Sequence, residues 1–187
     1  SLALSRKLQR TGVFRQAMNT FAREIAESIY TSFTVPATFM IGGANIEDLV
    51  SEAENYSRII LAKHEFSAGC MAEAASRVTW GNTSEFDQKR QLGVVMVTSG
   101  GAALNILPAL AEAYSNRTPI LVLVGATSTN LDGKSVFQEM SGIGGALNLE
   151  EIYRPVTRFC KRITSIDEWI DNWNTARELL SRSAREY

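Results

Sequence analysis

The sequence has little of the chemistry that builds metal centres and disulfide frameworks. It contains one histidine and two cysteines among 187 residues. The cysteines, Cys70 and Cys160, form no CxxC pair and have no histidine cluster beside them, which excludes the usual zinc and disulfide patterns. Because free cysteine is usually buried, we expect both to be reduced thiols in the core. No metal site is predicted on this chain.

The chain also lacks any strong bias in charge or hydropathy. Its 19 basic residues almost balance 20 acidic ones, for a net charge of −1, so no basic stripe favours nucleic acid or an anionic membrane surface. No apolar run approaches the roughly 20 residues of a membrane-spanning helix, and the first residues lack the charged-then-apolar order of a signal peptide. We therefore expect a soluble, cytoplasmic protein with no nucleic-acid or membrane partner.

What the sequence does contain is a series of short apolar runs separated by helical patterns. With 45% hydrophobic residues, the chain can bury the core of one compact domain. The runs at 92–97 and 119–124 are continuously apolar, which indicates strands covered on both faces by helices. The predicted fold class is α/β, a three-layer α/β/α doubly wound parallel sheet. Residues 1–10 are predicted to be an N-terminal arm and residues 11–187 the single domain.

Periodicity and turn residues place the remaining elements. The predicted strands are 33–41, 56–62, 92–97, 119–124 and 156–163. The predicted helices are 11–30, 45–49, 65–78, one that runs through Leu107 and Tyr114, and 166–180. Asn45 is expected to cap the second of these helices. The polar segment at 80–90 is expected to be a surface excursion, and 132–149 an irregular, glycine-rich loop.

The stretch from 59 to 77 brings a carboxylate to the edge of the predicted sheet. An apolar strand ends just before Glu65, and small residues then recur at helical spacing at Ala68, Ala72 and Ala75. Side chains this small let a helix approach the sheet closely, so a carboxylate in its first turn would lie where the strands end. Glu65 is the candidate catalytic residue.

The other strand ends predict a ligand site at the same edge. In a doubly wound sheet, ligands bind outside the carboxyl ends of the strands, and glycine turns there offer free backbone N–H groups. The strand ends carry Gly42-Gly43, His64-Glu65, Thr98-Ser99-Gly100-Gly101 and Gly125-Ala126-Thr127. Structural explanations stay open, since a first-turn glutamate suits the helix dipole, glycine turns can be plain loops, and a lone histidine is often a structural hydrogen-bonding residue. The turns lack the GxGxxG order of a dinucleotide site.

Five segments carry a family pattern in register along the chain. They are His64-Glu65 with Ala68, Met71-Ala72 and Ala75-Ser76-Arg77; Thr98-Ser99-Gly100 with Ala103-Leu104-Asn105; Ala111-Glu112-Ala113-Tyr114; Pro119-Ile120 ending at Gly125; and Phe137-Gln138-Glu139 leading to Pro155-Val156-Thr157. Together they resemble the pyrimidine-binding, N-terminal domain of thiamine-diphosphate-dependent enzymes. The group concerned contains acetolactate synthase and related 2-oxoacid decarboxylases and carboligases.

The resemblance implies a role for each matched residue. In the family, the glutamate at the position of Glu65 hydrogen-bonds a ring nitrogen of the cofactor's aminopyrimidine and promotes its imino tautomer, which takes the proton from the thiazolium carbon. The resulting ylid attacks a 2-oxoacid, carbon dioxide leaves, and the enamine is protonated or passed to an acceptor. The implied cofactor-binding residues are Gly42, Gly43, His64, Thr98, Ser99, Gly100, Gly101 and Asn105. The implied substrate-side residues are Phe137 and Gln138.

Two departures from the family pattern bear on function. Both turns lack a proline of the family, since Gly101-Ala102 replaces the Pro-Gly of TSGPG and Ile41-Gly42-Gly43 ends the segment that resembles FGxPG. The chain also lacks the GDG…N motif with which the family binds the diphosphate and Mg in a separate domain. The resemblance thus implies thiamine diphosphate and Mg as cofactors, with Mg held by a second domain or subunit, in a homo- or hetero-dimer or tetramer.

Two alternatives from other classes stay open. The chain could be a non-catalytic binding or regulatory module that keeps the fold while its turns have changed. It could also be a flavodoxin-like nucleotide-binding protein, since that fold shares the predicted sheet.

Overall fold

A four-stranded parallel sheet forms the centre of the protein. The computed structural model describes residues 20–80 and 91–182, so the predicted arm at 1–10, the start of the first helix and most of the segment at 80–90 lie outside the described residues. The strands are β1 (Thr38–Met40), β2 (Ile59–Leu61), β3 (Gly93–Val97) and β4 (Ile120–Val124), in the order β2-β1-β3-β4. β2 lies on one side of β1, whereas β3 and β4 follow on its other side. The carboxyl ends of β1 and β3 therefore form a topological switch point.

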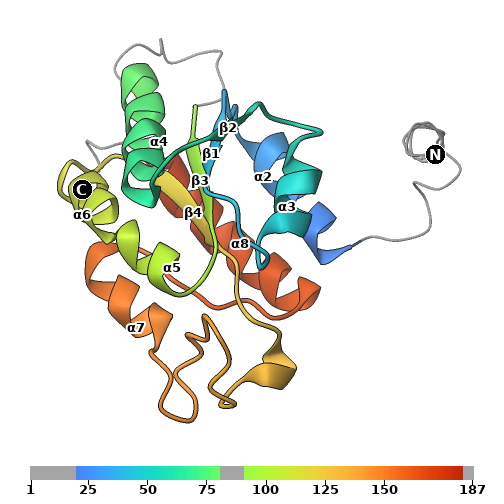
Figure 1. Ribbon diagram of the computed structural model, residues 1–187. Coiled ribbons are helices and arrows are strands. Elements are labelled where there is room, and N and C mark those ends of the chain that lie inside the picture. The colour runs from blue at the N-terminus through green and yellow to red at the C-terminus, as the bar shows by residue number, and fades with distance from the viewer. Residues whose placement is uncertain (1–19, 81–90, 183–187) are drawn as a thin grey trace, which may run out of the picture.

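Helices cover both faces of this sheet (Figure 1). One layer consists of α2 (Phe21–Ser32), α3 (Glu47–Ala53) and α8 (Ile166–Ser181), and the other of α4 (Glu65–Trp80), α5 (Gly101–Asn105), α6 (Leu107–Ser115) and α7 (Leu149–Tyr153). The side chains of β3 alternate between the layers. Val94 and Met96 pack with the first, Val95 and Val97 with the second, and all have 0% of their surface exposed. The predicted three-layer α/β fold is confirmed.

Helix α4 lies close against the sheet because the side chains that face it are small. Ala68 and Ala72 are fully buried. A Cβ atom on Gly93 of β3 would lie only 1.9 Å from the carbonyl oxygen of Ala72, and one on Gly69 would lie 2.5 Å from the Cβ of Ala109 in α6. The small residues at helical spacing therefore do what the sequence predicts, since they bring the start of α4 to the sheet edge.

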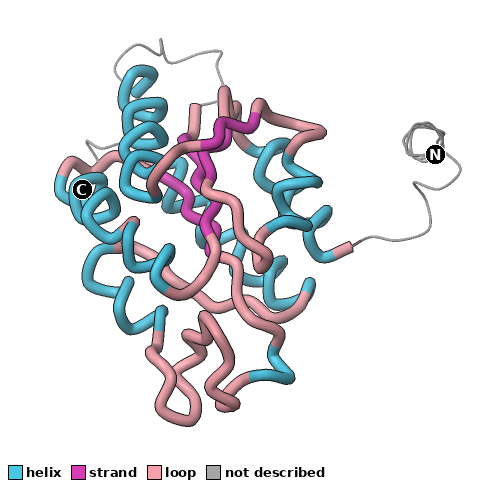
Figure 2. The backbone as a smooth tube through the Cα atoms, viewed as in Figure 1, coloured by secondary structure: helices cyan, strands magenta, loops and turns pink. Residues whose placement is uncertain are grey.

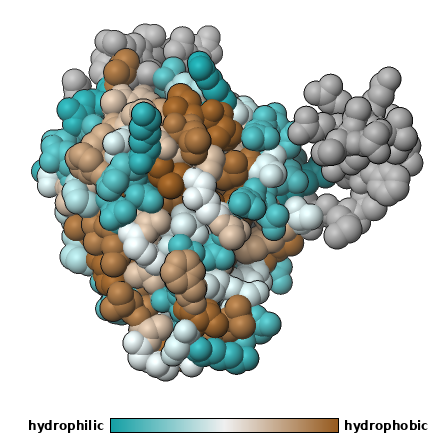
Figure 3. All heavy atoms as spheres, viewed as in Figure 1, coloured by the Kyte–Doolittle hydropathy of each residue, from teal (hydrophilic) through white to brown (hydrophobic). Residues whose placement is uncertain are grey.

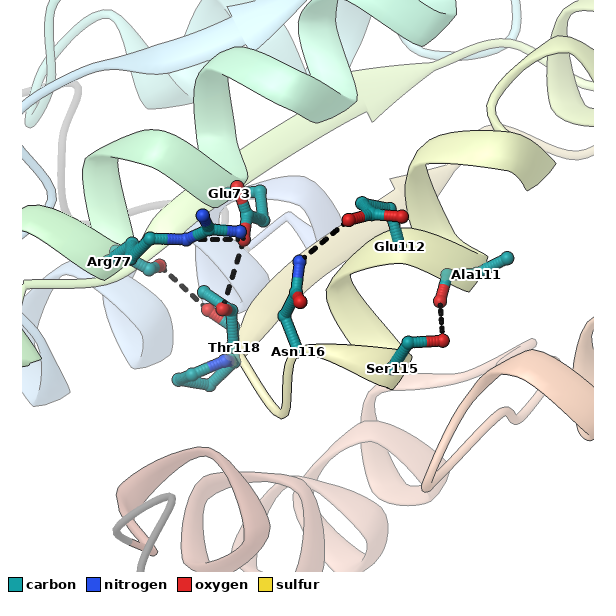
Figure 4. A network of polar contacts seen from close by, with 9 residues as sticks. Glu73, Arg77, Ala111, Glu112, Ser115, Asn116 and Thr118 are labelled. Carbon is teal, nitrogen blue, oxygen red and sulfur yellow. Dashed lines mark hydrogen bonds and ion pairs between the residues drawn. The ribbon is translucent and has the colours of Figure 1, made fainter.

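Polar contacts fix the second half of α4 to the neighbouring strands (Figure 4). Glu73, which is 9% exposed, accepts a hydrogen bond from Thr118 Oγ1 at 3.0 Å in the turn before β4. Ser76 Oγ donates to the carbonyl oxygen of Pro119 at 2.6 Å and accepts from the backbone N–H of Gly93 at 2.8 Å. Buried polar groups that are paired in this way fix a single arrangement of helix and strands.

Aromatic residues close the first helical layer. The rings of Trp169 and Trp173 stack with their centroids 5.1 Å apart, and Phe33 meets Trp173 edge-on at 6.2 Å. Trp169 Nε1 also donates to Ser28 Oγ in α2 at 3.1 Å. The helix predicted at 166–180 is confirmed as α8, and it buries both tryptophans.

The predicted strand at 156–163 is wrong. The chain there forms a short 3-10 helix, η2 (Arg154–Val156), followed by an irregular segment, and the described sheet ends at β4. Arg162 explains the difference because its guanidinium binds both carboxylate oxygens of Asp132 at 2.9 Å, while its backbone N–H donates to Glu150 Oε2 at 3.3 Å. These bonds hold the segment against α7 and the loop that precedes it, and a cavity of about 1130 Å³ lies between the segment and β4.

Most other predicted elements differ only in their ends, whereas the short helices α5 and α7 were not predicted. The strands predicted at 33–41 and 56–62 shorten to β1 and β2, and the helix predicted through Leu107 and Tyr114 is preceded by the separate helix α5. The irregular loop predicted at 132–149 is confirmed, and Figure 2 shows the chain between β4 and α7 running mostly as loop, with the 3-10 helix η1 (Thr129–Leu131) near its start.

Within 20–80 and 91–182, none of the helices combines the length and the apolar character that crossing a bilayer requires. Figure 3 shows hydrophobic side chains over the edge strand β2, where Leu61 is 72% exposed. Single exposed apolar residues of this kind are common on protein surfaces.

Candidate functional site

The turns that follow β1 and β3 meet at the switch point. A Cβ atom on Gly43, after β1, would lie 2.6 Å from the Cβ of Thr98, at the end of β3, so the two turns approach each other closely only because residue 43 is glycine. Thr98 is 5% exposed, and its hydroxyl is buried with no hydrogen-bond partner among the described residues. Such an atom costs about 1–3 kcal/mol when it is left unpaired, so it marks a place where a polar group of a ligand would bind favourably.

Glu65 lies buried at the same edge of the sheet. It is the first residue of α4 and is 7% exposed. Its Oε2 accepts a hydrogen bond from Asn105 Nδ2 at 3.0 Å, and Asn105 ends α5, which begins directly after the turn that follows β3. Among the described residues no donor binds Oε1, so one carboxylate oxygen is left for a ligand. Glu65 therefore lies where the sequence predicts it, attached to the loop at 98–101 through α5.

His64 makes a structural contact. Its side chain is exposed, and its Nδ1 accepts the backbone N–H of Phe66 at 3.2 Å. The ring therefore caps the first turn of α4, which is the structural role that the sequence left open. The cofactor contact implied for His64 stays a prediction.

The loop at 132–149 packs on the turn after β3. Gly100 has a φ of +76°, and a Cβ atom there would lie 2.8 Å from Gln138 Cγ, so glycine is required both by its backbone conformation and by the space available. The N–H of Gly100 also donates to Met140 Sδ at 3.2 Å. Gln138 thus lies at the site, whereas Phe137 is 88% exposed. The side chain of Phe137, which was predicted for the substrate side, is exposed to solvent.

Asn45 belongs to the site, although the sequence placed it only as a helix cap. That expectation is wrong, because Ile46 occupies the N-cap position of α3 and makes no side-chain capping bond. Asn45 Nδ2 instead donates to Ser99 Oγ at 2.9 Å and to Gln138 Oε1 at 3.4 Å. A Cβ atom on Gly125, after β4, would lie 2.2 Å from the backbone oxygen of Asn45. The signal in the sequence was a polar residue two positions after the paired glycines at the switch point.

Of the residues predicted for the site, some meet at the switch point and others lie at its margin. Gly43 lies against Thr98, and Gly100 lies against Gln138. Hydrogen bonds from Asn45 connect Ser99 with Gln138. Glu65 and Asn105 form a bonded pair at the start of α4. The exposed positions are Gly42, His64, Gly101, Asn105 and Phe137. The functional roles of all these residues stay predictions.

Glu139 makes hydrogen bonds within the loop at 132–149. Its Oε1 accepts hydrogen bonds from the backbone N–H of Gly133 and from Ser141 Oγ, the latter at 2.8 Å. The Gly133 N–H, and after it the Ser141 hydroxyl, hold the pKa of the Glu139 carboxyl below its ordinary value, because hydrogen bonds to the charged form favour that form. Glu139 lies between Gln138 and Met140, so it supports the stretch of loop that contacts Gly100.

Loss of the Glu139 charge is expected to loosen this loop in acid. Since the folded pKa lies below the unfolded value of about 4.3, the stabilisation is complete above that value and is lost as the pH falls through the folded pKa. Amide hydrogen exchange at Gly133 should be faster in Glu139→Gln than in wild type at pH 7, because a neutral acceptor bonds more weakly. The two proteins should converge as the pH falls below the folded pKa of Glu139. Equal exchange at pH 7 would contradict the role of the charge.

This arrangement suits a flat, polar ring. Glycine turns admit a ring close to the backbone, the Thr98 hydroxyl lacks a partner in the described part of the chain, and Glu65 offers a carboxylate oxygen. A buried carboxylate next to neutral donors can accept an N–H from a heterocycle or exchange a proton with it. None of the described residues form a group of three or more His, Cys, Asp or Glu side chains suited to a metal ion.

Comparison with known proteins gives a consistent result. The family described as "Thiamine pyrophosphate enzyme, N-terminal TPP binding domain" matches residues 20–144. The mitochondrial acetolactate synthase of Schizosaccharomyces pombe is 39% identical over 85 residues, which cover 46% of this chain and 11% of that protein. The mitochondrial acetolactate synthase catalytic subunit of Saccharomyces cerevisiae is 30% identical over 129 residues, covering 68% of this chain and 16% of that protein.

A second kind of relative matches more of the chain. The 2-hydroxyacyl-CoA lyase 2 of Mus musculus is 27% identical over 175 residues, covering 89% of this chain and 25% of that protein. The chain therefore spans about a quarter or less of the length of each of these three relatives.

Proposed function

The chain belongs to the thiamine-pyrophosphate-dependent enzymes, as their N-terminal, pyrimidine-binding domain, and we propose that it serves an enzyme that decarboxylates 2-oxoacids or joins them to an acceptor. The observation that carries this proposal is the position of Glu65, buried at the sheet edge with one oxygen bonded to Asn105 and the other left for a ligand. Relatives named acetolactate synthase support the substrate class.

The residues at the switch point fit the cofactor. Thr98 contributes a buried hydroxyl without a partner among the described residues, and Gly43 keeps the turn after β1 free of a side chain. When bound, thiamine diphosphate would supply the thiazolium ring, which takes up the electron pair left by decarboxylation. Glu65 would accept the N–H of a ring nitrogen and hold or return its proton, while Asn105 keeps the carboxylate aimed from the first turn of α4.

The remaining parts of the active site are proposed to lie elsewhere. We propose that a second domain or subunit binds the diphosphate and Mg, and that the protein assembles as a dimer or tetramer. The family description, which names an N-terminal TPP binding domain, supports a further domain. The cytoplasmic location stays a prediction.

A 2-hydroxyacyl-CoA is the second candidate substrate. The supporting observation is that the relative named 2-hydroxyacyl-CoA lyase 2 matches 89% of this chain, more than either acetolactate synthase described above. Turnover of a 2-oxoacid by the assembled protein, measured beside cleavage of a 2-hydroxyacyl-CoA, separates the two candidates.

Two adjacent glycines provide the test of the binding site. Gly43→Ala should weaken binding of thiamine diphosphate by about tenfold or more, which is roughly 1.4 kcal/mol, because the new Cβ would displace Thr98 and the turn. Gly42→Ala separates crowding of Thr98 from the loss of a glycine in this turn, since its Cβ would meet only Met40 Cε, at 3.9 Å. Affinity is measured by calorimetric titration of the assembled protein in the presence of Mg, with thermal melting as a check on folding.

The same titration separates the proposal from its alternatives. Flavin mononucleotide, titrated in parallel, should not bind. A wild-type protein that binds flavin or nucleotide and ignores thiamine diphosphate would support the flavodoxin-like alternative. A wild-type affinity in Gly43→Ala would show that the ring does not lie at the turns after β1 and β3.

A further inference from the structure

The side-chain amide of Asn45 connects two parts of the site that are far apart in the sequence. Its Nδ2 donates to Ser99 Oγ at 2.9 Å and to Gln138 Oε1 at 3.4 Å. Ser99 is 2% exposed and follows β3, so the first bond anchors Asn45 on a fixed part of the sheet. The second bond reaches from this anchor to a loop residue that no strand holds.

The backbone of Gln138 is already fixed by other contacts. Its φ is +66°, a left-handed conformation that costs non-glycine residues about 1–3 kcal/mol and persists only when the surroundings impose it. Its neighbours provide those surroundings, because Glu139 binds the N–H of Gly133 and Met140 accepts the N–H of Gly100. The backbone of Gln138 is therefore fixed, and what can still change is the orientation of its side-chain amide.

The bond from Asn45 acts on that rotation. An amide has a donor end and an acceptor end, and a donor placed beside it selects the acceptor. Because Asn45 Nδ2 donates, it binds Gln138 Oε1 and turns Nε2 the other way. In the described part of the chain no acceptor is bonded to Gln138 Nε2, so this group can donate to a ligand.

We propose that Asn45 is a positioning residue that makes Gln138 a hydrogen-bond donor toward the substrate, and so selects substrates with an acceptor oxygen such as a carboxylate or carbonyl oxygen. This inference rests on the proposed function, since it takes Gln138 to lie on the substrate side of the cofactor. It adds that the donor character of Gln138 is set by a residue of a different loop. Asn45 itself contacts Gln138 and Ser99.

Asn45→Asp tests the orientation of the amide. The two side chains have the same shape, but a carboxylate can only accept hydrogen bonds, so it would bind Gln138 Nε2 and turn Oε1 toward the substrate. We expect KM for the 2-oxoacid to rise by about tenfold to a hundredfold, as when a hydrogen bond to a charged group is replaced by a repulsion. The fall in kcat should be smaller, and the Kd for thiamine diphosphate should stay within about threefold of wild type.

A second background separates orientation from the new negative charge. In Gln138→Ala, the change Asn45→Asp should raise KM by less than about twofold, because the amide through which it acts is gone. If Asn45→Asp does not fold, the cycle of Asn45→Ala and Gln138→Ala gives the same information, since the two changes should be clearly non-additive in KM. Thermal melting and the Kd for thiamine diphosphate are measured for every variant.

The outcomes distinguish this inference from the proposed function. An unchanged KM in Asn45→Asp, or an equal rise in both backgrounds, while wild type binds thiamine diphosphate, would overturn the positioning role alone. A wild-type protein that does not bind thiamine diphosphate would overturn the proposed function and this inference with it. A rise in KM that depends on Gln138 supports the inference.

Discussion

Glu65→Gln is expected to slow hydrogen–deuterium exchange at the thiazolium carbon of thiamine diphosphate by about a hundredfold to ten-thousandfold, the usual contribution of a positioned acid or base. Glutamine keeps the shape of the side chain and can still accept the hydrogen bond from Asn105 Nδ2. It cannot take up a proton. The change therefore removes the proton-transfer step and leaves the packing at the start of α4 in place.

The measurement follows loss of the C2 proton signal by NMR after acid quench, in the assembled protein with cofactor and Mg. Cofactor affinity should change far less than the exchange rate, because the rest of the pocket is intact. Glu47→Gln is the control, since Glu47 is an exposed acidic residue in the first turn of α3. Both substitutions remove a charge from a helix N-terminus, worth about 0.3–1 kcal/mol, so a general effect on helix stability appears in both.

The result also separates an enzyme from a non-catalytic module. If exchange in Glu65→Gln equals that in wild type, Glu65 is not the proton-transfer group. If wild type itself shows no exchange above free cofactor, the chain keeps the fold without the chemistry. In that case Glu65→Gln would leave partner binding unchanged.

The sequence predicts the fold and the position of Glu65 because both depend on short-range patterns. Apolar runs identify strands covered on both faces, and the small side chains that precede and follow Ala72 identify a helix packed close to the sheet. Glu65 is the first residue of that helix, so its place at the sheet edge follows directly. The roles assigned to the turn residues rest on the resemblance.

The parts that the sequence does not predict depend on contacts between distant segments. Residues 156–163 have the composition of a strand, but the ion pair between Arg162 and Asp132, 30 residues apart, holds them in another path. The bond from Asn45 to Gln138 spans 93 residues. Local propensity contains no information about such partners, since strand and loop preferences are readily changed by tertiary contacts.

Gly93→Ala is expected to destabilise the protein by more than about 3 kcal/mol, at the upper end of the cost of overpacking a core. The added Cβ would lie 1.9 Å from the carbonyl oxygen of Ala72 and 2.8 Å from its Cα. These are backbone atoms, so no side-chain rotation can make room. Helix α4 would have to move off β3, and the hydrogen bond from the Gly93 N–H to Ser76 Oγ would be strained with it.

Movement of α4 would also displace Glu65 at its first turn, so Gly93→Ala should lower catalytic activity as well as stability. The control is Gly101→Ala, because a Cβ atom there would meet nothing within 4 Å. Replacing that glycine, at the first turn of α5, should leave stability unchanged or raise it slightly, by up to about 1 kcal/mol. Thermal melting of both variants gives the comparison, with a fall of roughly 6 °C or more expected for Gly93→Ala. A melting temperature within about 2 °C of wild type would show that α4 does not press on β3 as closely as the backbone contact requires.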